Sequence, residues 1–202
     1  MIPLILADEP HWFDAGVRQK GRAHLATVEA QRTEPLQSKH FQAFWARYTR
    51  EIHAIYSGIC AFTGLYIDFD EKIEDQKVSI DHFRPKVKYK SLAYEWANYR
   101  LCMKKINQRK GDSEEIIDPI SIPDNFFYLN IDDGSVKLRE FPGHETWVEA
   151  CKTTIDTLGL NNKHLRRRRS QLIQSYRISG DKDELKFRAP FLYYALKYQG
   201  VI

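Results

Sequence analysis

The spacing of apolar residues changes twice along this chain, and these changes restrict its fold more than any other feature. Before Gly58, and again from about residue 145 onward, apolar residues recur at intervals of three and four, which predicts amphipathic helices. Between Gly58 and Gly111 they form short extended runs instead, of which residues 78–83 are the clearest, ended by Pro85. The pattern predicts an α+β fold in which helices flank a small extended segment.

Two helices are predicted before Gly58. Residues 10–32 carry helically spaced apolar residues interrupted by two glycines, so one frayed or broken helix is expected there. After Pro35, bulky apolar residues recur at three and four up to Gly58, which predicts one strong amphipathic helix with a buried aromatic face. His40 and His53 fall within this second helix without other ligand-type residues nearby, and we interpret both as structural.

The last third of the chain is predicted to be a hairpin followed by helices. Residues 126–129 and 134–138 are short extended runs on either side of a turn with glycine at its bend. Three helix-length stretches follow, at residues 145–158, 161–179 and 183–198.

Length and composition favour one domain over residues 1–202. A chain of 202 residues with 43% hydrophobic and 29% charged residues can build a single well-packed core. It contains no apolar run of about eighteen residues, so a membrane span is not expected. Its three cysteines, Cys60, Cys102 and Cys151, are too few and too odd in number for a disulfide framework. They predict free thiols in a reducing compartment, the cytoplasm.

The residues best suited to chemistry lie around the end of the predicted strand. Asp81 and His82 are neighbours there, Asn98 follows, and Asn107 precedes Lys110 by one helical turn. A carboxylate is a hard oxygen ligand suited to a divalent cation, whereas a neutral imidazole takes a proton from water near physiological pH. Together they can divide the work of holding a divalent cation and moving a proton.

This ordered set resembles the active site of the HNH endonucleases, the ββα-metal or His-Me finger nucleases. The resemblance implies a ββα-metal finger at residues 59–118, embedded between N-terminal helices (1–58) and a hairpin with C-terminal helices (119–202). It also implies catalytic roles for His82, as general base, and for Asn98, which orients it. Asp81 and Asn107 would hold Mg²⁺ or Mn²⁺.

The basic residues of the same segment would bind the nucleic-acid substrate through its phosphates. The residues expected to do so are Arg84, Lys86, Arg109 and Lys110. Residues 77–112 hold ten basic and three acidic side chains, a net charge of +7, although the whole chain is only at +4. Positive charge around a metal site suits a polyphosphate. An acidic stretch at residues 68–75 is expected to be an exposed loop that pairs with this basic segment.

The sequence departs from the resemblance at its cysteines. Many members of the family carry two Cys-x-x-Cys pairs that hold a structural zinc ion. Here Thr63 and Lys105 replace the second cysteine of each pair, and only Cys60 and Cys102 remain. Two thiolates with those replacements would not hold tetrahedral zinc, so no Zn²⁺ is expected and Cys60 and Cys102 are interpreted as buried remnants.

Two further stretches narrow the resemblance. Residues 82–86 and 153–161 are similar to the PtuB nucleases of Septu and retron-associated antiviral systems, which are encoded beside an ABC-type ATPase. The resemblance implies a PtuA-like ATPase partner and degradation of nucleic acid after phage infection. Independently of it, residues 153–161 predict a helix that ends at Gly159 and a new one capped by Asn161 or Asn162.

Several alternatives remain open from the sequence. The finger could be a non-catalytic nucleic-acid or partner-binding module, or an endonuclease for RNA such as tRNA, because phosphate contacts carry no sugar information.

Four consecutive arginines at residues 166–169 favour a solvated or partner-facing helix, and the aromatic residues near the C-terminus favour a partner interface. Asp118 is assigned to a turn, and His144 and His164 to surface or capping positions.

Overall fold

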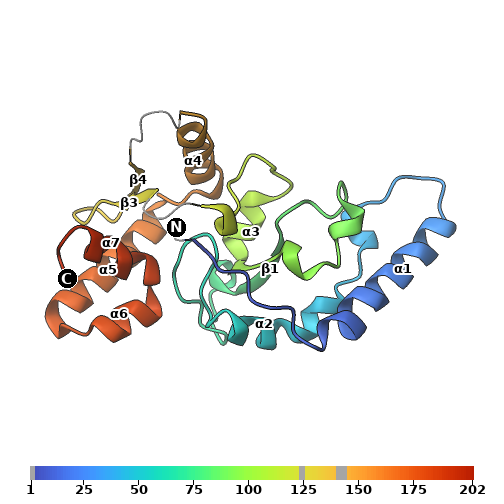
Figure 1. Ribbon diagram of the computed structural model, residues 1–202, viewed down its shortest axis with the longest axis horizontal. Helices are drawn as coiled ribbons and strands as arrows, with labels where there is room; N and C mark the ends of the chain where they lie inside the picture. The colour runs from blue at the N-terminus through green and yellow to red at the C-terminus, as the bar shows by residue number, and fades with distance from the viewer. Residues whose placement is uncertain (1–2, 123–125, 140–144) are drawn as a thin grey trace.

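The structure is a computed structural model, and it describes residues 3–122, 126–139 and 145–202 (Figure 1). It combines helices with two small antiparallel sheets, in agreement with the α+β prediction. The helices are α1 (Gln19–Ala30), α2 (Thr49–Ile55), α3 (Lys104–Lys110), α4 (Glu145–Leu158), α5 (Lys163–Ser179), α6 (Lys182–Arg188) and α7 (Pro190–Tyr198). The strands are β1 (Val78–His82), β2 (Tyr99–Met103), β3 (Phe127–Leu129) and β4 (Val136–Leu138).

The centre of the molecule is the pair β1 and β2 with helix α3. The strands are antiparallel, with Val78 opposite Met103 and His82 opposite Tyr99, and α3 starts directly after β2 and packs against both strands. The predicted strand at residues 78–83 is therefore confirmed to within one residue. Turns of 3₁₀ helix at Lys90–Leu92 and Trp96–Asn98 occupy the connection between the strands.

The first predicted helix is confirmed and begins irregularly. A π-helical turn at Asp14–Arg18 leads into α1. Gly21, which we expected only to weaken the helix, is required by close packing: a Cβ there would lie 2.2 Å from the ring of Tyr94. Figure 1 shows α1 at one end of the long axis of the molecule, beside the β1–β2 connection.

The prediction of one long helix after Pro35 was wrong. The segment contains 3₁₀ turns at Ser38–His40 and Phe44–Tyr48 and only two regular α-helical turns, in α2. The backbone is extended at Phe41, so the aromatic side chains are buried from separate short turns instead of one helix face. His40 accepts the backbone N–H of Gln37, and His53 is hydrogen-bonded to the Ile67 carbonyl, so the structural interpretation of both histidines is confirmed.

The C-terminal elements match the predicted capping residues. Helix α4 ends before Gly159, whose φ of +61° is left-handed, and the Asn162 side chain caps α5 by accepting the backbone N–H of Leu165. Asn161 has a different role, since its side chain bonds both the N–H and the C=O of Val136 in β4 at 2.7 and 2.8 Å. Asn161, in the turn between α4 and α5, therefore attaches the β3–β4 hairpin to the start of α5. The hairpin itself was predicted correctly.

One other C-terminal prediction was wrong, and one stays a prediction. The helix expected at residues 183–198 is interrupted at Ala189, where the non-helical backbone before Pro190 separates α6 from α7. The partner interface expected at the C-terminal aromatic residues stays a prediction: Phe191 lies in the core of its own chain, whereas Tyr194 and Tyr198 are exposed.

The prediction of a solvated helix for the arginine run on α5 was also wrong. Arg166 bonds Asp133, Arg168 donates to the Tyr66 carbonyl, and Arg169, which is fully buried, donates to the carbonyls of Gly134 and Leu160. Only Arg167 of the four is exposed. The other three arginines bind backbone and turn groups within the chain.

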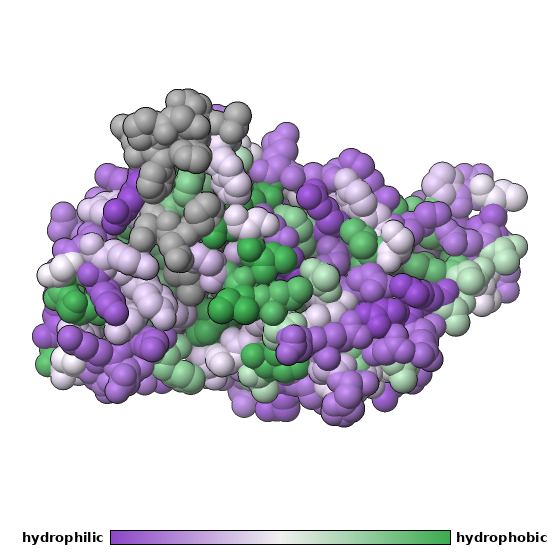
Figure 2. All heavy atoms as spheres, in the orientation of Figure 1, coloured by the Kyte–Doolittle hydropathy of each residue, from purple (hydrophilic) through white to green (hydrophobic). Residues whose placement is uncertain are grey.

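The surface is mainly polar, with an apolar area in the middle of the face shown in Figure 2, where the N-terminal segment runs in Figure 1. Ile5 in that segment is 88% exposed. No helix of the described ranges has the length and apolar content that crossing a bilayer requires. His144 lies outside the described residues, and His164 is exposed at the start of α5.

Candidate active site

Strand β1 divides the predicted site residues between its two faces. Because side chains alternate along a strand, Ser79 and Asp81 point to one side and His82 to the other. Asn107 lies on the same side as Ser79, since its side-chain amide donates to the Ser79 hydroxyl at 2.8 Å and to the Ile80 carbonyl at 3.2 Å. Lys110, one helical turn further along α3, reaches Asp81. The structure thus brings Asp81 and Asn107 to one face of the finger.

Asp81 and Lys110 form a buried ion pair. The Lys110 ammonium lies 3.1 Å from Asp81 Oδ1 and donates to the His82 carbonyl at 3.0 Å, and its side chain has no exposed surface. The prediction that Lys110 binds phosphate is therefore corrected: this lysine is a counter-charge inside the finger. A buried carboxylate needs such a partner because the ionised form is poorly solvated away from water.

Burial raises the pKa of Asp81 to about 6, and the nearby positive charges of Lys110 and Arg100 partly offset this effect. Arg100 stands opposite Asp81 in the sheet and is itself buried. It makes a two-pronged ion pair with Asp118, at 3.0 and 2.7 Å. Asp118 also caps the 3₁₀ turn at Pro119–Ser121, so its predicted turn role is confirmed.

His82 is held as a neutral imidazole. Its Nε2 lies 2.9 Å from the Ala93 carbonyl, and because a carbonyl only accepts, Nε2 carries the proton and Nδ1 keeps its lone pair. The ring packs edge-on against Trp45 and Tyr99, with centroids 4.6 and 5.0 Å away. Burial, with a smaller contribution from the Lys86 charge, lowers the pKa of His82 to about 3. The imidazole is therefore neutral at physiological pH and keeps one nitrogen lone pair that can accept a proton.

Asn98 acts on the loop and not directly on His82. Its Oδ1 accepts the backbone N–H of Arg84 at 2.7 Å, and its Nδ2 donates to the carbonyls of Arg84 and Leu92 at 3.0 and 3.1 Å. The prediction of a direct orienting bond to His82 is corrected. Asn98 closes the connection between β1 and β2, and Ala93, the residue after Leu92, supplies the carbonyl that orients the histidine.

The four predicted phosphate contacts divide into two pairs. Arg109 donates to the carbonyls of Leu158 and Gly159, both at 3.2 Å, at the end of α4, so its predicted role is corrected to a structural one, as for Lys110. Arg84 and Lys86 stay near His82. The Lys86 ammonium lies 5.5 Å from the Trp45 ring centroid, on the indole that also contacts His82. Arg84 is half-exposed, 4.0 Å from Glu114.

Most basic residues of the finger are already paired with carboxylates. Some of these carboxylates belong to the acidic stretch at residues 68–75, whose pairing with the basic segment was predicted. Glu74 pairs with Lys77 and Lys104, and these two ammonium groups lower the pKa of Glu74 to about 2. Glu114 pairs with Lys88 and contacts Arg84. Further pairs join Lys90 to Glu29 and Lys105 to Asp75. The +7 segment is therefore not a free basic surface.

The oxygen atoms facing α3 fit a hard divalent cation. Asp81 Oδ2 is buried and has no hydrogen-bond partner among the described residues. Asn107 uses its amide nitrogen in both of its hydrogen bonds, which leaves Oδ1 available as a ligand. One carboxylate oxygen and one amide oxygen, completed by water and substrate phosphate, are a suitable ligand set for Mg²⁺ or Mn²⁺.

The remnants of the cysteine pairs lie inside the core. Cys60, Cys102 and Thr63 have no exposed surface, and burial raises the pKa of the Cys102 thiol well above its usual value. Lys105, in the place of the fourth ligand, points to the surface, where it meets Asp75 at 3.4 Å. No group of three or more histidine, cysteine or acidic side chains within the described ranges is arranged to hold a metal.

Sequence reasoning missed the groups that fix His82. The Ala93 carbonyl carries no side-chain signal, and Trp45 lies far from the finger in sequence. The only signal that could have indicated Trp45 is the density of aromatic residues at 41–48.

The strand pair and helix hold a carboxylate, an imidazole and an amide at fixed places, and comparison with known proteins shows what this segment resembles. Residues 60–114 match the family model of the HNH endonucleases, which supports an HNH-type domain in this segment. A relative covers more of the chain: "Retron Vc95 putative HNH endonuclease" of Vibrio cholerae serotype O1 biovar El Tor is 24% identical over 184 residues, 86% of this chain and 83% of the relative. Both matches support a nuclease function.

Proposed function

We propose that this protein is a metal-dependent endonuclease that hydrolyses phosphodiester bonds in nucleic acid, with His82 as general base. The observation that carries the proposal is the fixed tautomer of His82, whose Nε2–H donates to the Ala93 carbonyl while Nδ1 keeps its lone pair, one residue after the buried carboxylate of Asp81. An imidazole held in this way can take the proton of an attacking water. The match to the HNH endonuclease family supports the same chemistry.

The remaining residues have binding roles in this proposal. Asp81 and Asn107 would hold Mg²⁺ or Mn²⁺, and such an ion, when bound, stabilises the charge that develops on the phosphate and its leaving oxygen. Lys86 and Arg84 would bind the phosphates that flank the scissile bond, because both lie near His82 and keep partly accessible cationic groups. Asn98 would keep the loop between the strands closed around His82.

The substrate and cellular setting belong to the same proposal. We favour DNA as the substrate, and we place the protein in the cytoplasm because its three cysteines are free and buried. The relative named for a retron supports a retron setting. The role in antiviral defence beside an ABC-type, PtuA-like ATPase, and the PtuB-type assignment, rest on the resemblance of residues 82–86 and 153–161. Co-purification with the product of the neighbouring gene, with and without ATP, tests this partnership.

The catalytic assignment is tested by cleavage assays with a matched histidine control. His82→Ala should lower the rate on plasmid DNA by at least about 100-fold, the range that a general base contributes. His164→Ala removes an exposed histidine on α5 and should cleave like the wild type. Asn107→Ala should raise the Mn²⁺ concentration needed for half-maximal activity, and EDTA should stop the reaction.

Three outcomes would contradict the proposal. Cleavage by His82→Ala at the wild-type rate would remove the histidine from the mechanism. A wild-type protein that binds Mn²⁺ by calorimetry and cleaves neither DNA nor RNA would be a non-catalytic module. Cleavage of structured RNA alone would leave the mechanism intact and reverse the substrate assignment.

A further inference from the structure

The carbonyl that orients His82 belongs to a segment with little regular structure. Ala93 is fully buried, and its oxygen accepts from His82 Nε2 at 2.9 Å and from the Tyr99 hydroxyl at 3.1 Å. Ala93 lies between two 3₁₀ turns of three residues each, so no sheet or longer helix fixes the direction of this carbonyl. Its position depends on side-chain contacts on either side of Ala93.

Three consecutive side chains after Ala93 are each held by the N-terminal part of the chain. The ring of Tyr94 lies directly over Gly21, where a Cβ would come within 2.2 Å, and its hydroxyl donates to the Gln42 carbonyl at 3.0 Å. The indole N–H of Trp96 donates to the Ala7 carbonyl at 2.7 Å. Between them stands Glu95.

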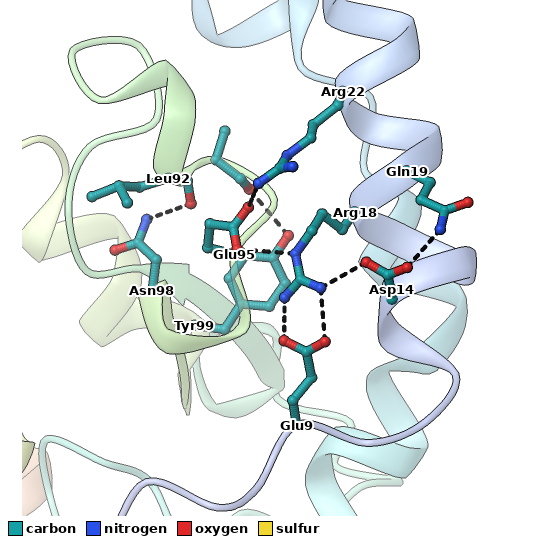
Figure 3. Close-up of polar contacts among 10 residues, drawn as sticks. Glu9, Asp14, Arg18, Gln19, Arg22, Leu92, Glu95, Asn98 and Tyr99 are labelled. Atoms are coloured by element: carbon teal, nitrogen blue, oxygen red, sulfur yellow. Dashed lines mark hydrogen bonds and ion pairs between the residues drawn. The ribbon is translucent and has the colours of Figure 1, made fainter.

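Glu95 is fastened to α1 and the turn before it by two arginines, as Figure 3 shows. Arg18 Nε lies 2.9 Å from one carboxylate oxygen and Arg22 Nη2 lies 2.6 Å from the other. Arg18 is held in turn by Glu9 and by Asp14, at 2.7 Å from the latter (Figure 3). The Arg18 side chain is only 16% exposed, so its charge is poorly screened by water compared with Arg22, which is 64% exposed.

We infer that Arg18 is a positioning residue of the nuclease site, which acts through Glu95 to fix the Ala93 carbonyl and with it the orientation of His82. This inference rests on the proposed function. It extends the functional unit to residues 7–42, outside the segment 60–114 that matches the HNH family. Arg18 and Arg22 each bond a different carboxylate oxygen of Glu95, and two bonds restrain this side chain more than one.

The test compares Arg18→Ala with Lys20→Ala, which removes a positive charge from an exposed position two residues further on, in α1. Arg18→Ala should lower kcat about tenfold to a hundredfold, the cost of a small misplacement of a catalytic group, while KM stays within about twofold. Lys20→Ala should match the wild type. Arg18→Lys should recover part of kcat, and adding Glu95→Ala to Arg18→Ala should lower kcat no further.

A second readout separates this inference from the proposed function. Long-range ¹H–¹⁵N spectra report which nitrogen of His82 carries the proton, with or without cleavage activity. Wild type and Lys20→Ala should show the Nε2–H form alone, and Arg18→Ala, folded by circular dichroism, should show a mixture of forms. An unchanged His82 pattern in Arg18→Ala, or an unchanged kcat, would overturn the inference. Arg18→Lys and Glu95→Gln repeat the comparison if Arg18→Ala does not fold.

Discussion

Replacing Lys110 by methionine should cost this protein far more stability than replacing another lysine of the same short helix. The Lys110 ammonium and Asp81 Oδ1 are 3.1 Å apart and buried. Unit charges at that separation attract by about 5 kcal/mol at an effective dielectric constant of about 20. Loss of one member of a buried pair typically costs about 3–5 kcal/mol, because the other charge stays behind without a partner. We expect Lys110→Met to lose about that amount.

Urea unfolding followed by tryptophan fluorescence measures this loss. With a slope of about 2–3 kcal/mol per molar urea, the midpoint should fall by about 1–2 M. Lys105→Met is the matched control, since Lys105 lies on α3, is 44% exposed and pairs with Asp75 at the surface. Surface pairs contribute less than about 1 kcal/mol, so its midpoint should move little. The double variant Asp81→Asn with Lys110→Met should recover part of the loss, because neither charge remains.

The reasoning is refuted if Lys110→Met and Lys105→Met unfold at the same urea concentration. A second refuting result would be a normal midpoint for Lys110→Met together with weaker binding of DNA. That combination would return Lys110 to the phosphate-binding role that its position in the sequence suggests.

Two further predictions concern the scaffold. Asn161→Ala should lower the free energy of unfolding by about 1–3 kcal/mol, because it strands the buried N–H and C=O of Val136, and a loss below about 0.5 kcal/mol would contradict this. The three buried cysteine thiols should not react with Ellman's reagent at pH 8 in the folded protein and should all react in urea, and rapid labelling without denaturant would count against their burial.

Elements with strong local signals could be predicted from the sequence. Strand β1 carries β-branched residues and ends near Pro85, and the turn between α4 and α5 has Gly159 and Asn162 where a helix end and a helix start need them. The order of Asp81, His82, Asn98 and Asn107 along the chain likewise indicates which segment forms the candidate site.

The roles of individual polar side chains could not be predicted, because they depend on partners far away in sequence. Arg109 and Lys110 are neighbours at the end of α3, yet one reaches the end of α4 and the other reaches Asp81. The long helix expected after Pro35 failed for a related reason. An interval of three residues is also satisfied by 3₁₀ turns, so the spacing alone does not separate the two. Trp45 packs against His82 from such a 3₁₀ turn, a contact between residues far apart in sequence.

The pairing of finger lysines with Glu74 and Glu114 has a consequence for how salt should affect substrate binding. A phosphate that displaces dissolved counterions from free lysines gains entropy, and such binding weakens steeply as salt rises. Lys77, Lys88 and Lys104 are instead paired with Glu74 and Glu114 of the same chain. A phosphate that binds these lysines would displace carboxylates that stay attached to the protein, so few dissolved ions are released. Binding of nucleic acid to these paired lysines should therefore depend weakly on salt concentration. A polyanion must also break these ion pairs to bind there, which lowers the affinity for unspecific polyanions.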